Sequence, residues 1–404
     1  MSSGWQQHAV KIEAPKELLK PLHIPDRILM GPGPSNCSQR VLESLRNQVL
    51  GHLHPETLQL MDEIKAGLRY AFQTNNRLTL ALSASGHAGM EAGLENILEP
   101  GETLLVTTSS IWGERAAEMA DRIGVDVHFL GNEIGVPFSR EQLESAMVTY
   151  KPTAVFVVHG ESSTGLKQPL EGLGDIVHKY GALLVVDTVA SLGAEPFHSD
   201  AFGVDVVYTG SQKGLSGPPG ITPISFSPRA EKKIFKRKTK VPVFYWDMTV
   251  LGEYWRCFGR PALYHHTISA TLVYGLREAL AQLVEETLQR SWRRHAEAAE
   301  KLQQGLQERG FKLFIDNPEH RLNTITVVVL PDGVDWRLLL QRLINEHGIE
   351  IAGGLGSTAG KVLRIGLMGF NSNCQNVNKV LRALDDCLQD VMLFKRETWK
   401  KSRL

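Results

Sequence analysis

The sequence has few cysteines, no net charge and no long apolar run. Its four cysteines, Cys37, Cys257, Cys374 and Cys387, are scattered among 404 residues without a CxxC pair. This excludes a disulfide or zinc framework and fits a reducing compartment. Lys plus Arg and Asp plus Glu both number 44, so no overall positive field attracts nucleic acid. No apolar run approaches the roughly 20 residues that span a bilayer. We therefore expect small-molecule substrates, without a metal, nucleic acid or membrane.

The two ends of the chain differ in what they predict. The first twenty residues include Glu13 and Glu17 and lack an apolar segment, which argues against a secretory signal or a transit peptide. The chain stops at Ser402-Arg403-Leu404, a near variant of the Ser-Lys-Leu address that the peroxisomal import receptor reads. This tripeptide predicts a peroxisomal location, although an accidental basic tail would look the same.

The length predicts two domains. Up to about residue 285, apolar strands alternate with amphipathic helices, which predicts an α/β layered sheet. The expected strands are 79–82, 103–107, 125–130, 154–158, 183–186 and 206–208. A long helical stretch is expected over 267–310, followed by strands 324–330 and 362–365 and helices 336–346 and 377–393. We predict an N-terminal arm (1–25), a large domain (26–285) and a smaller C-terminal α+β domain (286–404).

Asp187 and Lys213 carry the strongest chemical signal. Asp187 ends the apolar run 181–187, and Lys213 follows the run 204–208. Ligands of parallel sheets bind at the carboxyl ends of the strands, so the two side chains can meet in one crevice. A carboxylate and an amine placed in this way suit pyridoxal phosphate: the lysine forms the Schiff base and the aspartate keeps the pyridine nitrogen protonated. A lone aspartate at this place would be a helix cap.

Other strand ends carry weaker signals. Ser85-Gly86-His87 opens a helix and can cradle a phosphate, or it is an ordinary turn. Trp112 can cover a flat ring or pack in the core. Ser162 can reach a ring substituent or belong to a polar turn, and Gln212 can donate to a phosphate.

The glycine-rich segment 353–361 does not match a nucleotide-binding P-loop. Leu355 stands where the first motif glycine belongs, and Val362 replaces the required Ser or Thr. The nearby Arg364, on an expected strand, can bind a carboxylate bidentately or form a surface salt bridge. No GxGxxG motif follows the first strand, which disfavours a nicotinamide enzyme.

Several motifs in order resemble one family. They are Gly31-Pro-Gly-Pro-Ser-Asn36, Ser85-Gly86-His87, His159-Gly-Glu-Ser-Ser-Thr-Gly165, Val186-Asp187-Thr-Val-Ala-Ser191, Gly210-Ser-Gln-Lys213, Tyr264-His-His-Thr267 and Leu363-Arg364-Ile-Gly366. From about residue 27 to 388, the chain resembles the alanine–glyoxylate (serine–pyruvate) aminotransferases. The resemblance implies a fold-type I enzyme with a mostly parallel, seven-stranded type of sheet.

The resemblance also implies the role of each site residue. Lys213 and Asp187 would be catalytic, and Val189 would pack against the cofactor ring opposite Trp112. The phosphate or ring would be held by Ser85, Gly86, His87 and Gln212, and Ser162 would lie by the phenolic oxygen. Arg364 and the backbone of Gly33 would bind the α-carboxylate of the substrate.

The family resemblance further implies a homodimer. Tyr264 and Thr267 would reach the phosphate in the neighbouring subunit, with isologous contacts. The N-terminal arm would drape over the partner.

The implied reaction is ping-pong transamination of alanine, or serine, with glyoxylate to give pyruvate and glycine. The insect 3-hydroxykynurenine transaminases are similar and differ mainly in the substrate pocket, including the loop at Gly51-His52, so the preferred donor stays open. A fold-type I lyase such as a cysteine desulfurase would need a mobile nucleophilic cysteine, which no motif here suggests. A non-catalytic protein on this fold would not need both Asp187 and Lys213.

Overall fold

The computed structural model describes residues 12–108 and 110–401, except for the side chains of 389–401. Over these ranges its centre is a seven-stranded sheet in the order β2-β10-β9-β8-β5-β3-β4. Neighbouring strands run parallel apart from β10, which is antiparallel to both β2 and β9. The strands are β2 (Leu78–Leu82), β3 (Thr103–Val106), β4 (Asp126–Phe129), β5 (Ala154–Val158), β8 (Leu183–Asp187), β9 (Val206–Tyr208) and β10 (Thr222–Phe226).

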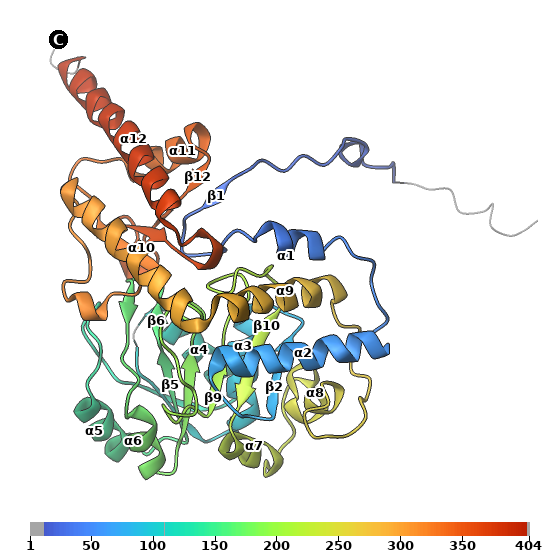
Figure 1. Cartoon of the computed structure of the whole chain (residues 1–404). Coiled ribbons are helices and arrows are strands. Elements are labelled where there is room, and N and C mark those ends of the chain that lie inside the picture. The colour runs from blue at the N-terminus through green and yellow to red at the C-terminus, as the bar shows by residue number, and fades with distance from the viewer. Residues whose placement is uncertain (1–11, 109, 402–404) are drawn as a thin grey trace, which may run out of the picture.

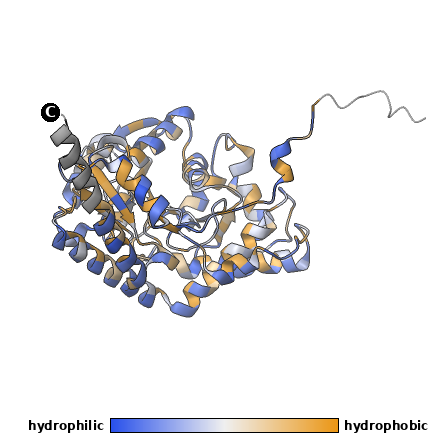
Figure 2. Ribbon diagram, turned by 90° about the horizontal axis from the view of Figure 1, so that it is seen from above, coloured by the Kyte–Doolittle hydropathy of each residue, from blue (hydrophilic) through white to orange (hydrophobic). Residues whose placement is uncertain are grey.

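The middle of this sheet is buried on both faces. Every residue of β2, β5, β8, β9 and β10 is buried, as expected for strands that helices cover on both sides. Helices α2 (Pro55–Phe72) and α9 (Ala270–Glu286) lie side by side (Figure 1). The helix α3 (Gly86–Ile97) packs on β9 and β10. Hydrophilic and hydrophobic segments alternate along the outer helices (Figure 2).

The other helices and short strands of this part of the chain lie between or beside the strands of the large sheet in the sequence. They are α1 (Gln39–Ser44), α4 (Ile111–Arg122), α5 (Arg140–Tyr150), α6 (Leu173–Lys179), α7 (Pro228–Phe235), α8 (Met248–Tyr254), β6 (Gly160–Glu161) and β7 (Leu166–Lys167). Within the described ranges, no helix combines the length and the hydrophobicity needed to cross a membrane.

The predicted strands of the sheet are confirmed, with ends that move by a residue or so. The strand β10 was not among them. Pro223 lies inside it and cannot donate a backbone hydrogen bond, which argues against a central strand when only the sequence is read. In the structure Pro223 pairs in register with Ala81, and its carbonyl accepts from the backbone N–H of Thr209 at 3.0 Å.

The helical stretch expected over 267–310 is two helices. The first is α9, and the second is α10 (Leu288–Glu308). Thr287 separates them with a φ of 74°, a conformation that a helix cannot contain. Its side chain accepts from the backbone N–H of Arg290 and so caps the second helix.

The C-terminal part forms a second core around a three-stranded antiparallel sheet. Its order is β11-β14-β13. Its elements are β11 (Ile325–Val329), β13 (Ala352–Gly353), β14 (Val362–Gly366), α11 (Trp336–Glu346) and α12 (Cys374–Lys401), joined by α10. The strand β1 (Ile28–Leu29) pairs in parallel with β12 (Ile349–Glu350), and Met30 is buried in this second core. Residues 12–26 run away from the body (Figure 1). The domain boundaries near residues 25 and 285 stay predictions.

Gly89 lets α3 lie close to the sheet. A Cβ atom at this position would stand 2.5 Å from Thr222 Cγ2 and 3.1 Å from Tyr208 Cδ2. Both neighbours belong to buried strands that cannot easily move.

We therefore expect Gly89→Ala to lower the free energy of unfolding by about 1–3 kcal/mol, as overpacking does. Urea denaturation followed by circular dichroism measures this change. Gly131→Ala is the matched control, because a Cβ there has open space around it. Equal stability of the two variants would contradict the close approach.

Candidate active site

A cavity lies at the carboxyl ends of β5, β8 and β9. Its lining brings together the residues predicted at separate strand ends: Ser85, Gly86, His87, Trp112, Ser162, Asp187, Val189, Gln212 and Lys213. Met90, Val158, Gly160, Ala190 and Tyr208 complete the lining. No cysteine is among these residues, so the cavity lining gives no support to the cysteine desulfurase alternative.

Asp187 ends β8 and is 4% exposed. One carboxylate oxygen accepts from the backbone N–H of Val189 at 2.7 Å, and the other accepts from the hydroxyl of Tyr208 at 2.6 Å. Burial raises the pKa of Asp187 to about 6, although both hydrogen bonds favour the ionised form. The carboxylate is thus fixed in direction and kept largely ionised at neutral pH.

Tyr208 was not predicted as a site residue. It stands opposite Asp187 in the register of β8 and β9, so its place at the strand end was a usable signal. An aromatic ring within a buried strand is usually a packing residue, which hides the polar role of its hydroxyl.

Lys213 follows β9 and turns back toward the strand ends. Its Nζ donates to the carbonyl of Pro32 at 2.5 Å. Burial, followed by the positive charge of Arg364, lowers the pKa of Lys213 to about 8, although Asp187 opposes this shift. A fraction of the amine is therefore neutral and nucleophilic near neutral pH. Gly33, with a φ of 111°, lies against this side chain and leaves no room for a Cβ.

The start of α3 offers free hydrogen-bond donors. Ser85 is its N-cap residue, but the serine side chain makes no capping hydrogen bond. The space beside Gly86 is open, because a Cβ atom there would meet only Val189 within 4 Å, at 3.7 Å. Across the cavity, the buried Oε1 of Gln212 has no hydrogen-bond partner among the described residues. A helix N-terminus with unused donors suits an anionic group such as a phosphate. The Gln212 side chain can add its NH2 group as a donor, whereas its Oε1 can only accept.

Trp112 and Ser162 form one wall. The indole Nε1 of Trp112 donates to the Ser162 hydroxyl at 2.8 Å, which fixes the ring plane. The His87 ring lies edge-on to it, with 5.8 Å between centroids. Val189 lines the same cavity. An indole face and an aliphatic side chain suit a flat aromatic ligand.

Arg364 lies on β14 and is 7% exposed, so the surface salt-bridge alternative is wrong. Its Nε donates to the carbonyl of Gly353 at 2.8 Å, and Nη1 donates to the carbonyl of Ser162 at 3.2 Å. Burial lowers its pKa, opposed by the charge of Glu161. Among the described residues no carboxylate forms an ion pair with it, so its positive charge can attract an anionic substrate.

Tyr264 and Thr267 are not part of this cavity lining. Both are exposed, and the Tyr264 ring instead lies 4.6 Å from the His52 ring, measured between centroids. Within one chain these two residues therefore do not reach the cavity, and their predicted role in a neighbouring subunit stays a prediction.

Comparison with known proteins decides the family. Residues 28–380 match the family described as "Aminotransferase class-V". The chain belongs to the class-V aminotransferase family. An alanine–glyoxylate aminotransferase of Callithrix jacchus is 48% identical over 392 residues, which is 96% of this chain and 95% of the relative.

Solved structures agree with this assignment. The aminotransferase is similar to an alanine–glyoxylate aminotransferase of a Nostoc species, with a TM-score of 0.91 and 46% identity over 94% of this chain and 100% of that one. It is also similar to a ureidoglycine–glyoxylate aminotransferase of Bacillus subtilis, with a TM-score of 0.89 and 34% identity over 92% and 95% of the two chains. The fold-type I prediction is confirmed.

In the aminotransferase without cofactor, we expect the buried Asp187 to lower the free energy of unfolding by an amount that depends on pH. Its pKa rises from 3.8 to about 6 on folding, so the folded protein binds a proton more readily, and stability falls as pH rises between these values. Asp187→Asn removes the charge. At pH 7.5 the cofactor-free variant should be more stable than the wild type by roughly 2–3 kcal/mol.

Urea denaturation at two pH values measures this difference. At pH 5 it should shrink to roughly half, because the wild-type carboxyl is then mostly protonated in the folded state. A difference that stays constant between pH 5 and pH 7.5 would contradict the raised pKa.

Proposed function

We propose that the chain catalyses pyridoxal phosphate-dependent transamination between L-alanine and glyoxylate, giving pyruvate and glycine. The observation that carries the proposal is the shared cavity of Lys213 and Asp187, with Arg364 acting on the Lys213 amine. The names of the similar proteins support the substrates: both kinds of relative use glyoxylate, and those about 46–48% identical are named for alanine. Serine and 3-hydroxykynurenine are the alternative amino donors, and their rates should be compared with that of alanine.

The cavity residues fit the cofactor. The start of α3 and Gln212 would hold its phosphate, Trp112 and Val189 would cover its ring, and Asp187 would face its ring nitrogen. When bound, pyridoxal phosphate supplies a ring that stabilises negative charge developing at the substrate Cα. The ionised Asp187 strengthens this effect by holding a proton on the ring nitrogen.

The protein side chains carry the remaining steps. Arg364 binds the α-carboxylate and so orients the amino acid over the cavity. The Lys213 amine, with its lowered pKa, takes the proton from Cα as a general base and returns a proton as a general acid. A base whose pKa lies near the working pH suits both directions of a ping-pong reaction.

A homodimer is part of the proposal. The arm exposes large apolar side chains that nothing in the described chain covers: Ile12, Leu18, Leu19, Leu22 and Ile24, each at least 72% exposed. Tyr264 is 56% exposed. It is therefore free to contact a neighbouring subunit, where Tyr264 and Thr267 are expected to complete the site. Apolar arm residues of this kind gain stability by packing on a second copy of the chain.

Peroxisomal import is a further part of the proposal, and it rests on the sequence alone. The tripeptide Ser402-Arg403-Leu404 lies outside the described residues, so its recognition by the import receptor stays a prediction.

Replacement of Lys213 tests the proposed reaction. Lys213→Ala should lower pyruvate formation from L-alanine and glyoxylate by roughly 10²–10⁴-fold or more, because the general base is lost. A coupled assay for pyruvate measures the rate. Lys179→Ala, which removes an exposed lysine paired with Glu144, should keep the wild-type rate. Turnover by Lys213→Ala at the wild-type rate would overturn the mechanism.

Mixed dimers test the shared site. Lys213→Ala subunits and subunits carrying both Tyr264→Ala and Thr267→Ala should each form inactive or weak homodimers. In a mixed dimer one site has a wild-type Lys213 together with wild-type Tyr264 and Thr267, so roughly half of the wild-type turnover should return. Differently tagged subunits, purified over both tags, provide the sample. No recovery would contradict a site built from two chains.

A further inference from the structure

A second, larger cavity lies beside the candidate active site. Its volume is about 360 Å³, whereas one water molecule needs only roughly 10–15 Å³ on this measure. It opens between the strand ends of the large sheet and the loop 355–357 of the C-terminal part. Val158 lines both cavities, but the residues assigned above to cofactor and substrate are otherwise absent from this lining.

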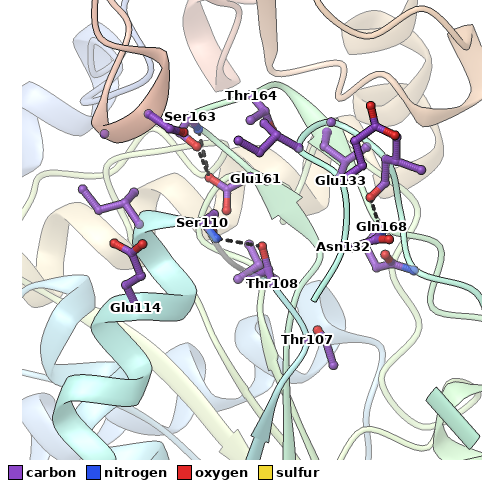
Figure 3. A pocket seen from close by; sticks show the side chains of 18 of the residues that line it. Thr107, Thr108, Ser110, Glu114, Asn132, Glu133, Glu161, Ser163, Thr164 and Gln168 are labelled. Carbon is purple, nitrogen blue, oxygen red and sulfur yellow. Dashed lines mark hydrogen bonds between the residues drawn. The ribbon is translucent and has the colours of Figure 1, made fainter. Parts of the chain in front are cut away.

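The charged residues of its lining are all acidic. They are Glu114 on α4, Glu133 in the loop after β4, and Glu161 after β5, and the lining contains no lysine, arginine or histidine. Hydroxyl and amide groups accompany them, as Figure 3 shows. Apolar side chains form the rest of the wall: Ile111, Ile134, Val136, Phe138, Val158, Leu166 and Leu355. The cavity therefore favours a cation with an apolar body.

Glu161 is the carboxylate that lies deepest. It is 4% exposed. Its Oε1 accepts from the backbone N–H of Ser163 at 3.0 Å and from the Ser163 hydroxyl at 2.9 Å. Its buried Oε2 has no hydrogen-bond partner among the described residues. Burial raises the pKa of Glu161, and the nearby hydroxyl of Ser110 and the donors of Ser163 only oppose this shift. No hydrogen bond of normal geometry joins Ser110 to the carboxylate.

Thr164 repeats the pattern. It is 4% exposed, and its Oγ1 also lacks a hydrogen-bond partner among the described residues. A buried carboxylate oxygen without a donor costs free energy. A ligand that brings N–H donors and a positive charge would satisfy both oxygens and offset the burial of Glu161.

We propose that this cavity is a binding site for a small organic cation that carries N–H donors and a short alkyl chain, of the alkylguanidinium or alkylammonium class. The cationic head would bind Glu161 Oε2 and the neighbouring hydroxyls, and the alkyl chain would lie against the apolar wall. A planar guanidinium matches a carboxylate with paired hydrogen bonds.

An occupied site would act on the turn next to the active site. Glu161 holds the turn that contains Ser162, whose hydroxyl accepts from Trp112 and whose carbonyl accepts from Arg364. Glu161 also affects the pKa of Arg364 directly. A cation at Glu161 would thus change the electrostatic field at Arg364, where the substrate carboxylate is expected to bind.

Calorimetric titration of the cofactor-loaded protein with ethylguanidinium chloride at millimolar concentrations tests the site. Ethylguanidinium is a poor nucleophile, so it does not react with the cofactor aldehyde as an alkylamine would. N-Ethylurea is the control ligand, because it has nearly the same shape and no charge. We expect saturable binding of the cation and at least tenfold weaker binding of the urea. Equal binding of the two, or no saturable binding, would overturn the proposal.

Variants locate the binding. Glu161→Gln keeps an acceptor for Ser163 and removes the charge, so the dissociation constant should rise at least tenfold. Glu114→Gln changes an exposed residue that folding tolerates, and it should weaken binding severalfold. Glu118→Gln, on the same helix but outside the lining, should bind as the wild type does. Unchanged binding in both Glu114→Gln and Glu161→Gln would place the cation elsewhere and contradict the proposal.

Discussion

The hydrogen bond from Tyr208 to Asp187 is the interaction on which the site depends. It joins the last residues of two neighbouring strands and fixes a buried carboxylate that would otherwise be costly to keep ionised. The backbone N–H of Val189 completes the arrangement. With the carboxylate fixed, burial and Arg364 can lower the pKa of Lys213 across the same cavity, while Asp187 limits that shift. Burial thus shifts the pKa of an acid upward and that of a base downward in one cavity, which is typical of an active site.

The fold supplies the two halves of this site from different cores. The central sheet places Asp187, Tyr208 and Lys213, while Arg364 comes from the second sheet. A segment near the N-terminus connects the two cores. The carbonyl of Pro32 accepts from Lys213, and the carbonyl of Met30 accepts from the backbone N–H of Gly366 at 2.6 Å. In the proposed mechanism, substrate orientation would thus depend on how the C-terminal part sits on the large sheet.

Much of this arrangement could be predicted from the sequence. Continuous apolar runs located the strands, and polar residues at their ends located the cavity, because parallel strands end at one edge of the sheet. The break at Thr287 and the strand around Pro223 could not be predicted, since tertiary packing overrides the local preference at both places. Tyr208 was missed because a ring in a buried strand is usually a packing residue. The role proposed for Tyr264 and Thr267 would need a second chain, so neither the residue pattern nor a single chain displays it.

The visible absorption spectrum of the purified protein, loaded with pyridoxal phosphate, tests the central claim most directly. We predict a cofactor band that L-alanine bleaches and glyoxylate restores, because Lys213 and Asp187 serve both half-reactions in one cavity. A parallel titration with 3-hydroxykynurenine should bleach the band less. Bleaching by 3-hydroxykynurenine but not by alanine would contradict the proposed donor. The absence of any band with added cofactor would contradict the enzyme site altogether.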